Sequence, residues 1–299
     1  MMNSVNWLNP YESASGEWRK GNLHTHTTRS DGGLNPADTV KMYIDNGFAF
    51  VSLTDHRALP EMVDYSNDSI KVLPGIEIDI DGGRHFCVVH TDPSAIIYDP
   101  AMTQQELIDA NIAAGALVTI NHPDWQIREH YTIDELYALR NYSGIEIYNF
   151  VIEFLEGSGL STAKWDRLLT NNHRVLGFAN HDLHQPGHMA HWGNMVLTPD
   201  NKPQTIFIAL QSGQFYCYNG VKINKVGRNG DTVFVETENA SLIRFVGQGG
   251  VILKKVKADS AELTFQTDDN YRYIRIECLG VGEEISYTQP FFRELTIDN

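Results

Sequence analysis

The sequence predicts an α/β protein with a parallel sheet, followed by a small antiparallel β-sandwich. Strand-like and helix-like stretches alternate over about the first 200 residues, which is typical of a parallel sheet joined by helices. The remaining residues contain short strand-like runs separated by turn signals. Composition changes at the same point, because residues 1–200 hold 12 basic and 26 acidic side chains while residues 201–299 hold 11 and 12. We therefore assign residues 1–214 to a first domain and residues 215–299 to an accessory domain.

The predicted strands of the first part are short, rich in Val, Ile and Phe, and in several cases continuously apolar, as in parallel strands covered on both faces. They are residues 21–26, 48–56, 72–80, 85–90, 117–122, 144–149 and 175–182. Helix starts are marked between them by Asn35-Pro36, by two T-x-x-E capping boxes at Thr103 and Thr132, and by Ser161. This alternation by itself does not distinguish a barrel from an open sheet.

The last hundred residues are predicted to be almost entirely β-structure. After a helix at residues 204–212, the expected strands are 233–236, 242–246, 251–256, 263–266, 273–277 and 291–297. Turn signals such as Asn229-Gly230 and Gly249-Gly250 separate several of them. Short strands without intervening helices favour a small antiparallel sandwich.

Charge and cysteine content exclude several classes of function. With 23 basic and 38 acidic residues, the formal net charge is −15, which repels nucleic-acid phosphates and anionic membranes. No apolar run approaches the length of a membrane span, and the first 20 residues lack the apolar stretch of a signal peptide. The three cysteines are far apart, so neither a disulfide framework nor a thiolate zinc site is expected. We expect a cytoplasmic protein that binds neither nucleic acid nor membrane.

Histidine and carboxylate side chains stand at the ends of successive predicted strands. His24 and His26 are two residues apart and therefore point to the same face of their strand. Six further residues of this kind lie in, at the ends of or just after other predicted strands: His56, Glu77, His85, His122, Asp182 and His184. Active sites of α/β folds are built at the carboxyl ends of strands, and buried charges are costly unless they are paired or bound to a metal. The pattern predicts a divalent metal centre with nitrogen and oxygen ligands, which admits Mn, Fe and Zn.

Taken together and in order, these strand ends resemble the motifs of the PHP (polymerase and histidinol phosphatase) family. The resemblance covers residues 17–200 and rests on residues 21–26 (GNLHTH), Ser30-Asp31-Gly32, Thr54-Asp55-His56, Gly75-Ile76-Glu77, Asn121-His122-Pro123 and Asp182-Leu183-His184. It implies a distorted (β/α)7 TIM-like barrel with two or three divalent metal ions at the carboxyl ends of its strands.

The resemblance also implies how the ligands are shared. One ion would be held by His24, His26, Glu77 and Asp182. Glu77 would bridge to a second ion held by His85 and His122, with His90 as an alternative to His85. A third ion would take Asp31, His56 and His184, although many relatives have His at the position of Asp31.

The C-terminal part has a resemblance of its own. Residues 211–216 (QSGQFY), 243–247, 271–277 and 287–290 are similar to a β-sandwich appended to one branch of PHP metallohydrolases, a branch that includes carbamate-insecticide hydrolases. Every candidate ligand lies before residue 185 and the segment after residue 200 has no histidine, so we expect the chemistry in the first part and an accessory role for the second.

The resulting functional prediction is a metal-dependent phosphoesterase for a small phosphorylated substrate. Two nearby cations would lower the pKa of a bridging water, and the hydroxide would attack phosphorus. Asp31, Asp182 or His181 could transfer a proton, and Arg29 could bind a substrate anion. An amide, ester or carbamate hydrolase with the same metals remains an alternative, as does a catalytically silent, metal-stabilised binding protein. The sequence has no P-loop, dinucleotide-binding glycine pattern or G-x-S-x-G motif.

Overall fold

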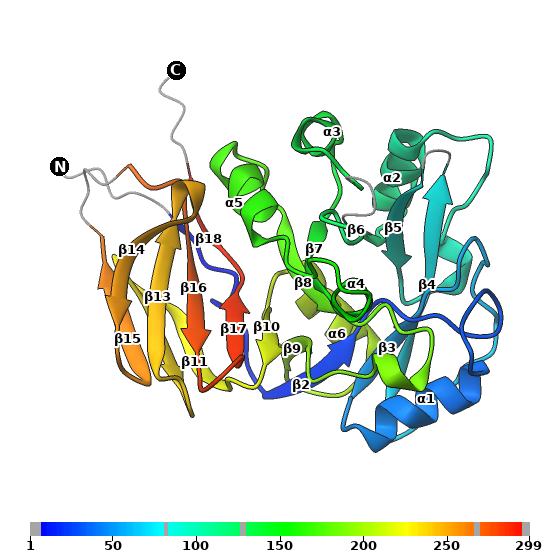
Figure 1. Ribbon diagram of the computed structural model, residues 1–299, viewed down its shortest axis with the longest axis horizontal. Coiled ribbons are helices and arrows are strands. Elements are labelled where there is room, and N and C mark those ends of the chain that lie inside the picture. Colours follow the sequence, from blue (N-terminus) through cyan, green and yellow to red (C-terminus); the bar gives the residue numbers. More distant parts are fainter. Residues whose placement is uncertain (1–6, 81–82, 126–129, 266–269, 295–299) are drawn as a thin grey trace.

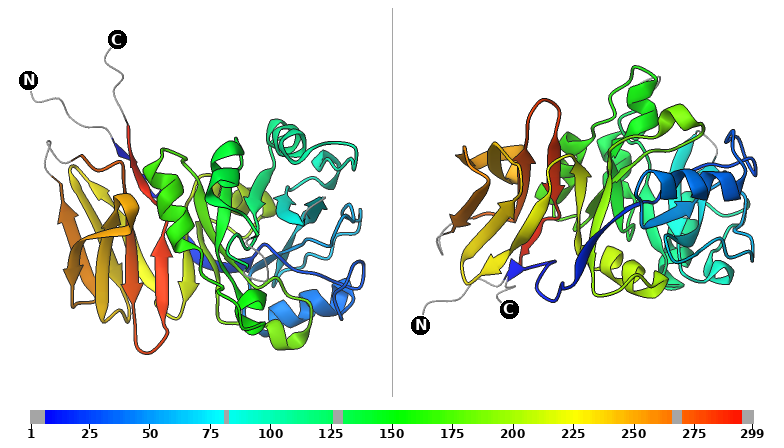
Figure 2. Two further views of the ribbon diagram at one scale, coloured as in Figure 1. Left: turned by 45° about the horizontal axis from the view of Figure 1, so that its top comes forward. Right: turned by 90° about the horizontal axis from the view of Figure 1, so that it is seen from below.

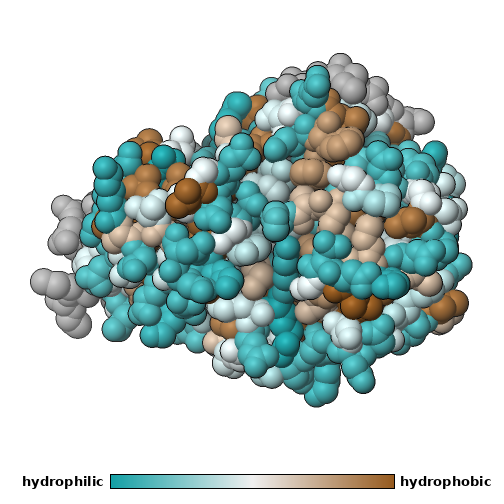
Figure 3. All heavy atoms as spheres, turned by 60° about the horizontal axis from the view of Figure 1, so that its bottom comes forward, coloured by the Kyte–Doolittle hydropathy of each residue, from teal (hydrophilic) through white to brown (hydrophobic). Residues whose placement is uncertain are grey.

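The computed structural model describes residues 7–80, 83–125, 130–265 and 270–294 and shows an α/β part joined to an antiparallel part (Figure 1). Every α-helix in these residues lies before residue 212. None of the helices described is both long and apolar enough to span a membrane. The face shown in Figure 3 is largely hydrophilic, with hydrophobic side chains in small groups.

All seven strands predicted in the first part are present. They are β2 (Glu17–Asn22), β3 (Phe50–Leu53), β4 (Lys71–Ile80), β5 (Arg84–Val89), β6 (Leu117–Ile120), β7 (Gly144–Asn149) and β8 (Leu176–Asn180). Four of them, β2, β3, β6 and β8, end at least two residues earlier than predicted. The residues after these four ends leave the sheet ladder, and they include most of the predicted metal ligands.

The helices are α1 (Pro36–Asp45), α2 (Gln104–Ala113), α3 (Ile133–Ala138), α4 (Phe150–Phe154), α5 (Thr162–Thr170) and α6 (Pro203–Gln211). Four of them, α1, α2, α3 and α5, begin where the sequence signals predicted, whereas α4 was not predicted. The Asn35 side chain caps α1, and both T-x-x-E motifs form complete capping boxes at α2 and α3. Each box satisfies two backbone N–H groups that would otherwise lack a partner, and so fixes where its helix starts.

Strand direction departs from the expected parallel sheet at β5. Strands β2, β3 and β4 pair in parallel, as do β6, β7 and β8, but β5 runs antiparallel to both β4 and β6. Only three residues separate β4 from β5, and a connection this short reverses the chain, whereas a parallel pair needs a crossover of a dozen or more residues. The amino end of β5 therefore lies beside the carboxyl ends of its neighbours.

Two strands that the sequence analysis missed connect the halves of the molecule. Strand β9 (Gly193–Thr198) pairs antiparallel with β2, and β10 (Phe215–Asn219) pairs with both β9 and β17 (Ile285–Thr288). The hydrogen-bonded strand order therefore continues from the α/β part into the C-terminal part. On the other side, the chain leaving β2 meets the chain leaving β8 through a parallel bridge between Thr25 and Leu183.

The C-terminal part consists of two antiparallel layers (Figure 2). One is a separate three-stranded sheet of β11 (Ile223–Asn229), β12 (Thr232–Thr237) and β15 (Ser260–Thr264). The other contains β13 (Leu242–Gly247), β14 (Val251–Val256), β16 (Tyr273–Leu279), β17, β18 (Phe291–Arg293) and the N-terminal β1 (Trp7–Leu8). Apolar residues from both layers, including Val233, Phe245 and Ile276, form one core. Parts of two predicted strands, residues 266 and 295–297, lie outside the described residues.

Candidate metal centre

The predicted ligands converge at the carboxyl ends of the α/β strands. His24 and His26 follow β2, His56 follows β3, Glu77 lies in β4, His122 follows β6, and Asp182 and His184 follow β8. His85 comes from the amino end of β5, which the hairpin places at the same end of the sheet. All nine predicted metal ligands belong to groups whose ligand atoms lie within 4.8 Å of one another.

The innermost group is fully buried and contains His24, His26, Glu77 and Asp182. The Nε2 atoms of the two histidines lie 3.2 Å apart, and they lie 3.2 and 3.0 Å from Asp182 Oδ1. That carboxylate oxygen is buried without a hydrogen-bond partner. These four residues bring nitrogen and oxygen ligand atoms, with no sulfur among them, within 4.8 Å of one another, which is a suitable set for a divalent cation.

Glu77 lies between the inner group and its neighbours. Its Oε1 is 3.3 Å from His24 Nε2, 3.2 Å from His85 Nδ1 and 3.6 Å from His122 Nε2. Its Oε2 is 3.2 Å from both His26 Nε2 and His56 Nδ1. One carboxylate therefore presents its two oxygens to different sets of imidazoles, as a bridging ligand would.

Asp31 occupies the outer edge of the cluster. Its carboxylate lies 3.4 Å from His184 Nε2, 3.8 Å from His56 Nε2 and 3.5 Å from His26 Nδ1. Unlike the inner group, its side chain is 57% exposed. The hydrogen bond from His184 lowers the pKa of Asp31, so this carboxyl is ionised.

Burial and charge act in opposite directions on the inner group. Burial alone would raise the pKa of Glu77 and Asp182 and lower that of His24, because each loses the solvation of its charged form. The facing opposite charges outweigh burial, so the carboxyl pKa values fall well below normal and the His24 pKa rises well above it. A concentrated negative charge therefore faces the imidazoles.

Glu146 orients the ligands and was not identified from the sequence. It is fully buried in β7, and its Oε1 lies 2.8 Å from His24 Nδ1. Its Oε2 accepts from the His122 backbone N–H at 2.8 Å, and Asn149 and Asn180 donate to the same carboxylate. Because Glu146 holds Nδ1 of His24, the Nε2 atom of the same ring faces the cluster. Metal-binding histidines commonly have such a carboxylate on their second ring nitrogen. The available signal was a glutamate inside a strand that is otherwise mostly apolar.

Backbone strain accompanies two of the ligands. His122 and Asp182 have positive φ angles of 28° and 55°, which are uncommon for residues with a Cβ atom. Such conformations persist only where surrounding contacts enforce them and are concentrated at functional sites. Positive φ angles also break the alternation of side chains between the two faces of a strand. The direction of each of these two side chains therefore cannot be predicted from residue spacing alone.

The PHP domain family model matches residues 22–179, more than half of the chain. The chain belongs to the PHP domain family. Among solved structures, a two-domain protein from Bacteroides vulgatus containing a predicted PHP-like metal-dependent phosphoesterase is similar over 98% of both chains, with 16% identity and a TM-score of 0.52. This likeness shows a shared fold across both parts of the chain.

Other solved structures match only part of the chain. A lesion-specific endonuclease from Pyrococcus furiosus shares 12% identity over 66% of this chain and 56% of its own, with a TM-score of 0.49. An amidohydrolase from Chromobacterium violaceum shares 15% identity over 56% of this chain and 88% of its own, with a TM-score of 0.41. The comparison with curated proteins gave no match.

His181 does not join the PHP cluster. Its Nε2 lies 2.8 Å from the Trp192 carbonyl oxygen and its Nδ1 lies 3.2 Å from Tyr43 Oη, so both ring nitrogens have protein partners. The ring stacks on Tyr43 and meets Phe48 edge-on. Burial lowers its pKa to about 3, which keeps it neutral. The proton-transfer role predicted for His181 is therefore not retained.

Arg29 and His90 are also directed elsewhere. The Arg29 guanidinium donates to the Leu59 carbonyl at 2.7 Å and lies 3.4 Å from Glu61. His90 lies just beyond the far end of β5, where its ring contacts Phe207. Between the two alternatives considered for the second ion, only His85 reaches the cluster.

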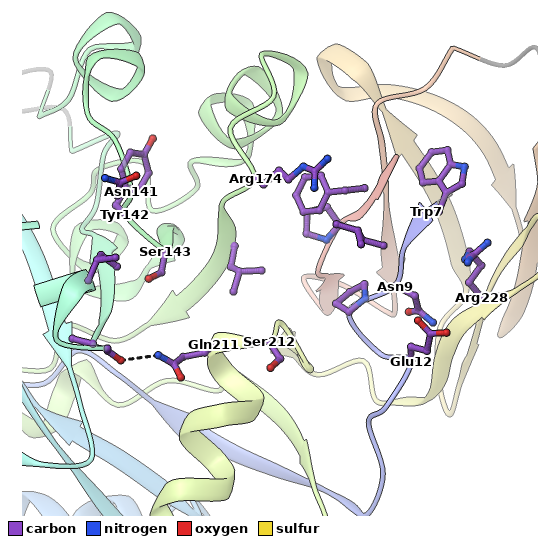
Figure 4. Close-up of a pocket in the computed structure, with 18 residues that line it drawn as sticks. Trp7, Asn9, Glu12, Asn141, Tyr142, Ser143, Arg174, Gln211, Ser212 and Arg228 are labelled. Carbon is purple, nitrogen blue, oxygen red and sulfur yellow. Dashed lines mark hydrogen bonds between the residues drawn. The ribbon is translucent and has the colours of Figure 1, made fainter. Parts of the chain in front are cut away.

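A cavity of about 690 Å³ lies away from this centre (Figure 4). Its lining includes Ala116, Ser143 and Arg174, which stand just before β6, β7 and β8. Gln211, at the end of α6, donates to the Gly115 carbonyl along its edge at 2.8 Å. The cavity is therefore at the amino ends of the strands, opposite the ligand cluster.

Proposed function

We propose that this PHP protein is a metal-dependent phosphoesterase that hydrolyses a small phosphorylated molecule. The observation that carries the proposal is Glu77, whose two oxygens face different imidazole sets within one buried cluster. A bridging carboxylate of this kind fits adjacent metal ions, which suit the in-line displacement of phosphate esters. The net charge of −15 favours a small substrate over a nucleic acid.

The donor atoms fit two or three divalent ions. His24, His26, Glu77 and Asp182 would hold the first ion. The Asp182 oxygen that has no hydrogen-bond partner would then bind that ion. Glu77, His85 and His122 would hold the second, and Asp31, His56 and His184 the third. Nitrogen and oxygen ligands without thiolate suit Mn, Zn or Fe.

When bound, the ions would supply Lewis acidity, which lowers the pKa of water and neutralises charge on phosphoryl oxygens. The protein's own contribution is to hold the ligands in place through Glu146 and to accept a proton. Asp31 would be open to the second role only with the third position empty, because a carboxylate that binds an ion and has a lowered pKa is a weak base. Arg29 would have to leave Glu61 before it could bind a substrate anion.

The proposal includes an architecture. We infer a distorted (β/α)7 barrel at residues 1–214, with the Thr25–Leu183 bridge joining its first and last strands, and an accessory sandwich at residues 215–299. The three buried free cysteines are suited to a reducing compartment, so we expect the protein in the cytoplasm.

Metal analysis and a matched substrate pair test this function. Protein purified without chelator, or reconstituted with Mn or Zn, should contain at least two ions per chain and should hydrolyse an aryl phosphate faster than the corresponding aryl ester. Chelation should abolish both the ions and the turnover.

The other outcomes are equally informative. Less than one equivalent of metal after reconstitution would remove the basis of the mechanism. Faster turnover of the ester would assign the chain to amide, ester or carbamate hydrolysis instead. A metal-loaded protein that turns over neither substrate, nor any member of a phosphate-ester panel, would be a binding protein.

A further inference from the structure

His130 lies against two ligands of the second metal position. Its ring centroid is 4.6 Å from that of His122 and 5.0 Å from that of His85, and those two are 5.2 Å apart. One ring nitrogen from each of the three histidines lies within 4.8 Å of the others. The three rings therefore surround one small space, although His130 is absent from the ligand set that the PHP resemblance implies.

The nitrogens of His130 differ from those of histidines that have structural partners. His181 uses both ring nitrogens in contacts of 2.8 and 3.2 Å, and His24 gives Nδ1 to Glu146 at 2.8 Å. His130 is fully buried, yet its Nδ1 has no hydrogen-bond partner and its Nε2 receives only a long 3.3 Å contact from the His85 backbone. A buried ring nitrogen without a partner is unfavourable unless a ligand binds to it, and binding through Nδ1 would put the ring proton on Nε2 and break the long contact with the His85 N–H.

The residues that directly follow His122 and His130 are joined by hydrogen bonds. The Lys164 ammonium donates to the carbonyl oxygens of Pro123 and Tyr131 at 2.7 and 2.6 Å. The Tyr131 backbone N–H also donates to the Pro123 carbonyl at 3.2 Å. Pro123 directly follows His122 and Tyr131 directly follows His130, so these contacts hold the backbone beside the two histidines together.

We propose that His130 is an additional ligand of the second metal ion, which is then held by His85, His122, His130 and Glu77. The inference rests on the proposed metal centre. Three imidazoles and one carboxylate form a nitrogen-rich donor set, whereas Mn and Mg favour oxygen. The second position should therefore prefer Zn, Fe or Co over Mn, and His130 should account for that preference.

Cobalt binding tests the proposal without relying on turnover. Metal-free wild-type protein, His130→Ala and His130→Gln would each be titrated with Co²⁺ while visible absorption is recorded, and affinities would be measured by chelator competition. The matched control is His173→Gln, because His173 is half-buried against Tyr137 and belongs to none of the ligand groups. Circular dichroism and the melting temperature of the metal-free proteins show which variants fold.

We expect one equivalent of Co²⁺ to bind at least about 10-fold more weakly in both His130 variants, since even loss of an outer hydrogen-bond partner of a ligand costs 10- to 100-fold. The visible absorption of this weaker-bound Co²⁺ should also change. The tighter-bound Co²⁺ should keep its wild-type affinity and absorption, and the His173→Gln protein should match wild type for both ions. Unchanged affinity and absorption in a folded His130 variant would overturn the assignment and leave the proposed function intact. Failure of wild-type protein to bind a second ion would instead refute the two-metal centre and this inference with it.

Discussion

Glu77 has the most connections in the cluster. It is buried in β4, and its two oxygens approach five histidines within 3.6 Å. Its other contact is a hydrogen bond donated by the Asn121 side chain. Removing its charge would leave five imidazoles without their shared partner.

Glu77→Gln should therefore impair two metal positions at once. The neutral amide is a weaker ligand and cannot bridge as a carboxylate does, so we expect metal content to fall below two and aryl-phosphate turnover to fall by at least about 100-fold. Arg29→Ala is the comparison, because this side chain contacts the loop at Leu59 and should change turnover much less. Near wild-type turnover in Glu77→Gln would mean that the carboxylate has a structural role.

Strand β2 leads into two predicted metal ligands and also carries a largely buried lysine. Its carboxyl end leads to His24 and His26, while Lys20 is largely buried and places its ammonium 4.2 Å above the Phe48 ring and 5.5 Å from Tyr218. Burial lowers the pKa of Lys20 to about 8 from its usual 10.5. Between these values the unfolded chain binds a proton that the folded chain does not, so raising the pH stabilises the fold across that window.

Lys20→Met should consequently be more stable than wild type at pH 7. We expect a gain of about 1–2 kcal/mol, below the roughly 3 kcal/mol that the pKa difference alone would give, because the Phe48 and Tyr218 rings favour the ammonium. The difference in unfolding free energy between Lys20→Met and wild type should shrink as the pH rises from 8 to 10. Urea denaturation of both proteins at pH 8 and at pH 10 measures it. A stability difference between the two proteins that stays constant with pH would contradict the lowered pKa of Lys20.

A buried ion pair joins the two halves of the molecule. Arg275 of β16 makes two contacts of 2.8 Å with Asp166 of α5, and Tyr273 donates to the same carboxylate at 2.8 Å. Both charged residues are almost fully buried. Together with the β9–β10 and β10–β17 ladders, these contacts tie the sandwich to the α/β part, so the two parts should unfold cooperatively.

Arg275→Met tests this connection. Removing one partner leaves the Asp166 carboxylate buried without its counter-charge, and we expect a loss of about 3–5 kcal/mol of unfolding free energy. Lys225→Met is the control, because the Lys225–Glu236 pair is exposed and should contribute at most about 1 kcal/mol. A single transition at lower temperature, with unchanged metal content in the folded protein, is the expected result. Equal effects in the two variants would argue against a structural role for the buried pair.

The sequence by itself determined the features that depend on neighbouring residues. Helix starts followed from the capping boxes at Thr103 and Thr132, and the strands of the first part followed from short apolar runs. Eight of the nine predicted ligands were proposed from their positions at or near predicted strands and Asp31 from the PHP resemblance, and the structure groups all nine. These signals are local, so no knowledge of the rest of the chain was needed.

Only the tertiary structure decided which groups meet across long sequence separations. It reversed β5 and thereby brought His85 to the cluster, turned His181 toward Tyr43, and placed Glu146 behind His24. It also brought His130, eight residues beyond His122, back against the same ligands. In each case the outcome depends on chain reversal, positive φ angles or packing between distant elements, and these arise from the free energy of the whole fold rather than from local propensity.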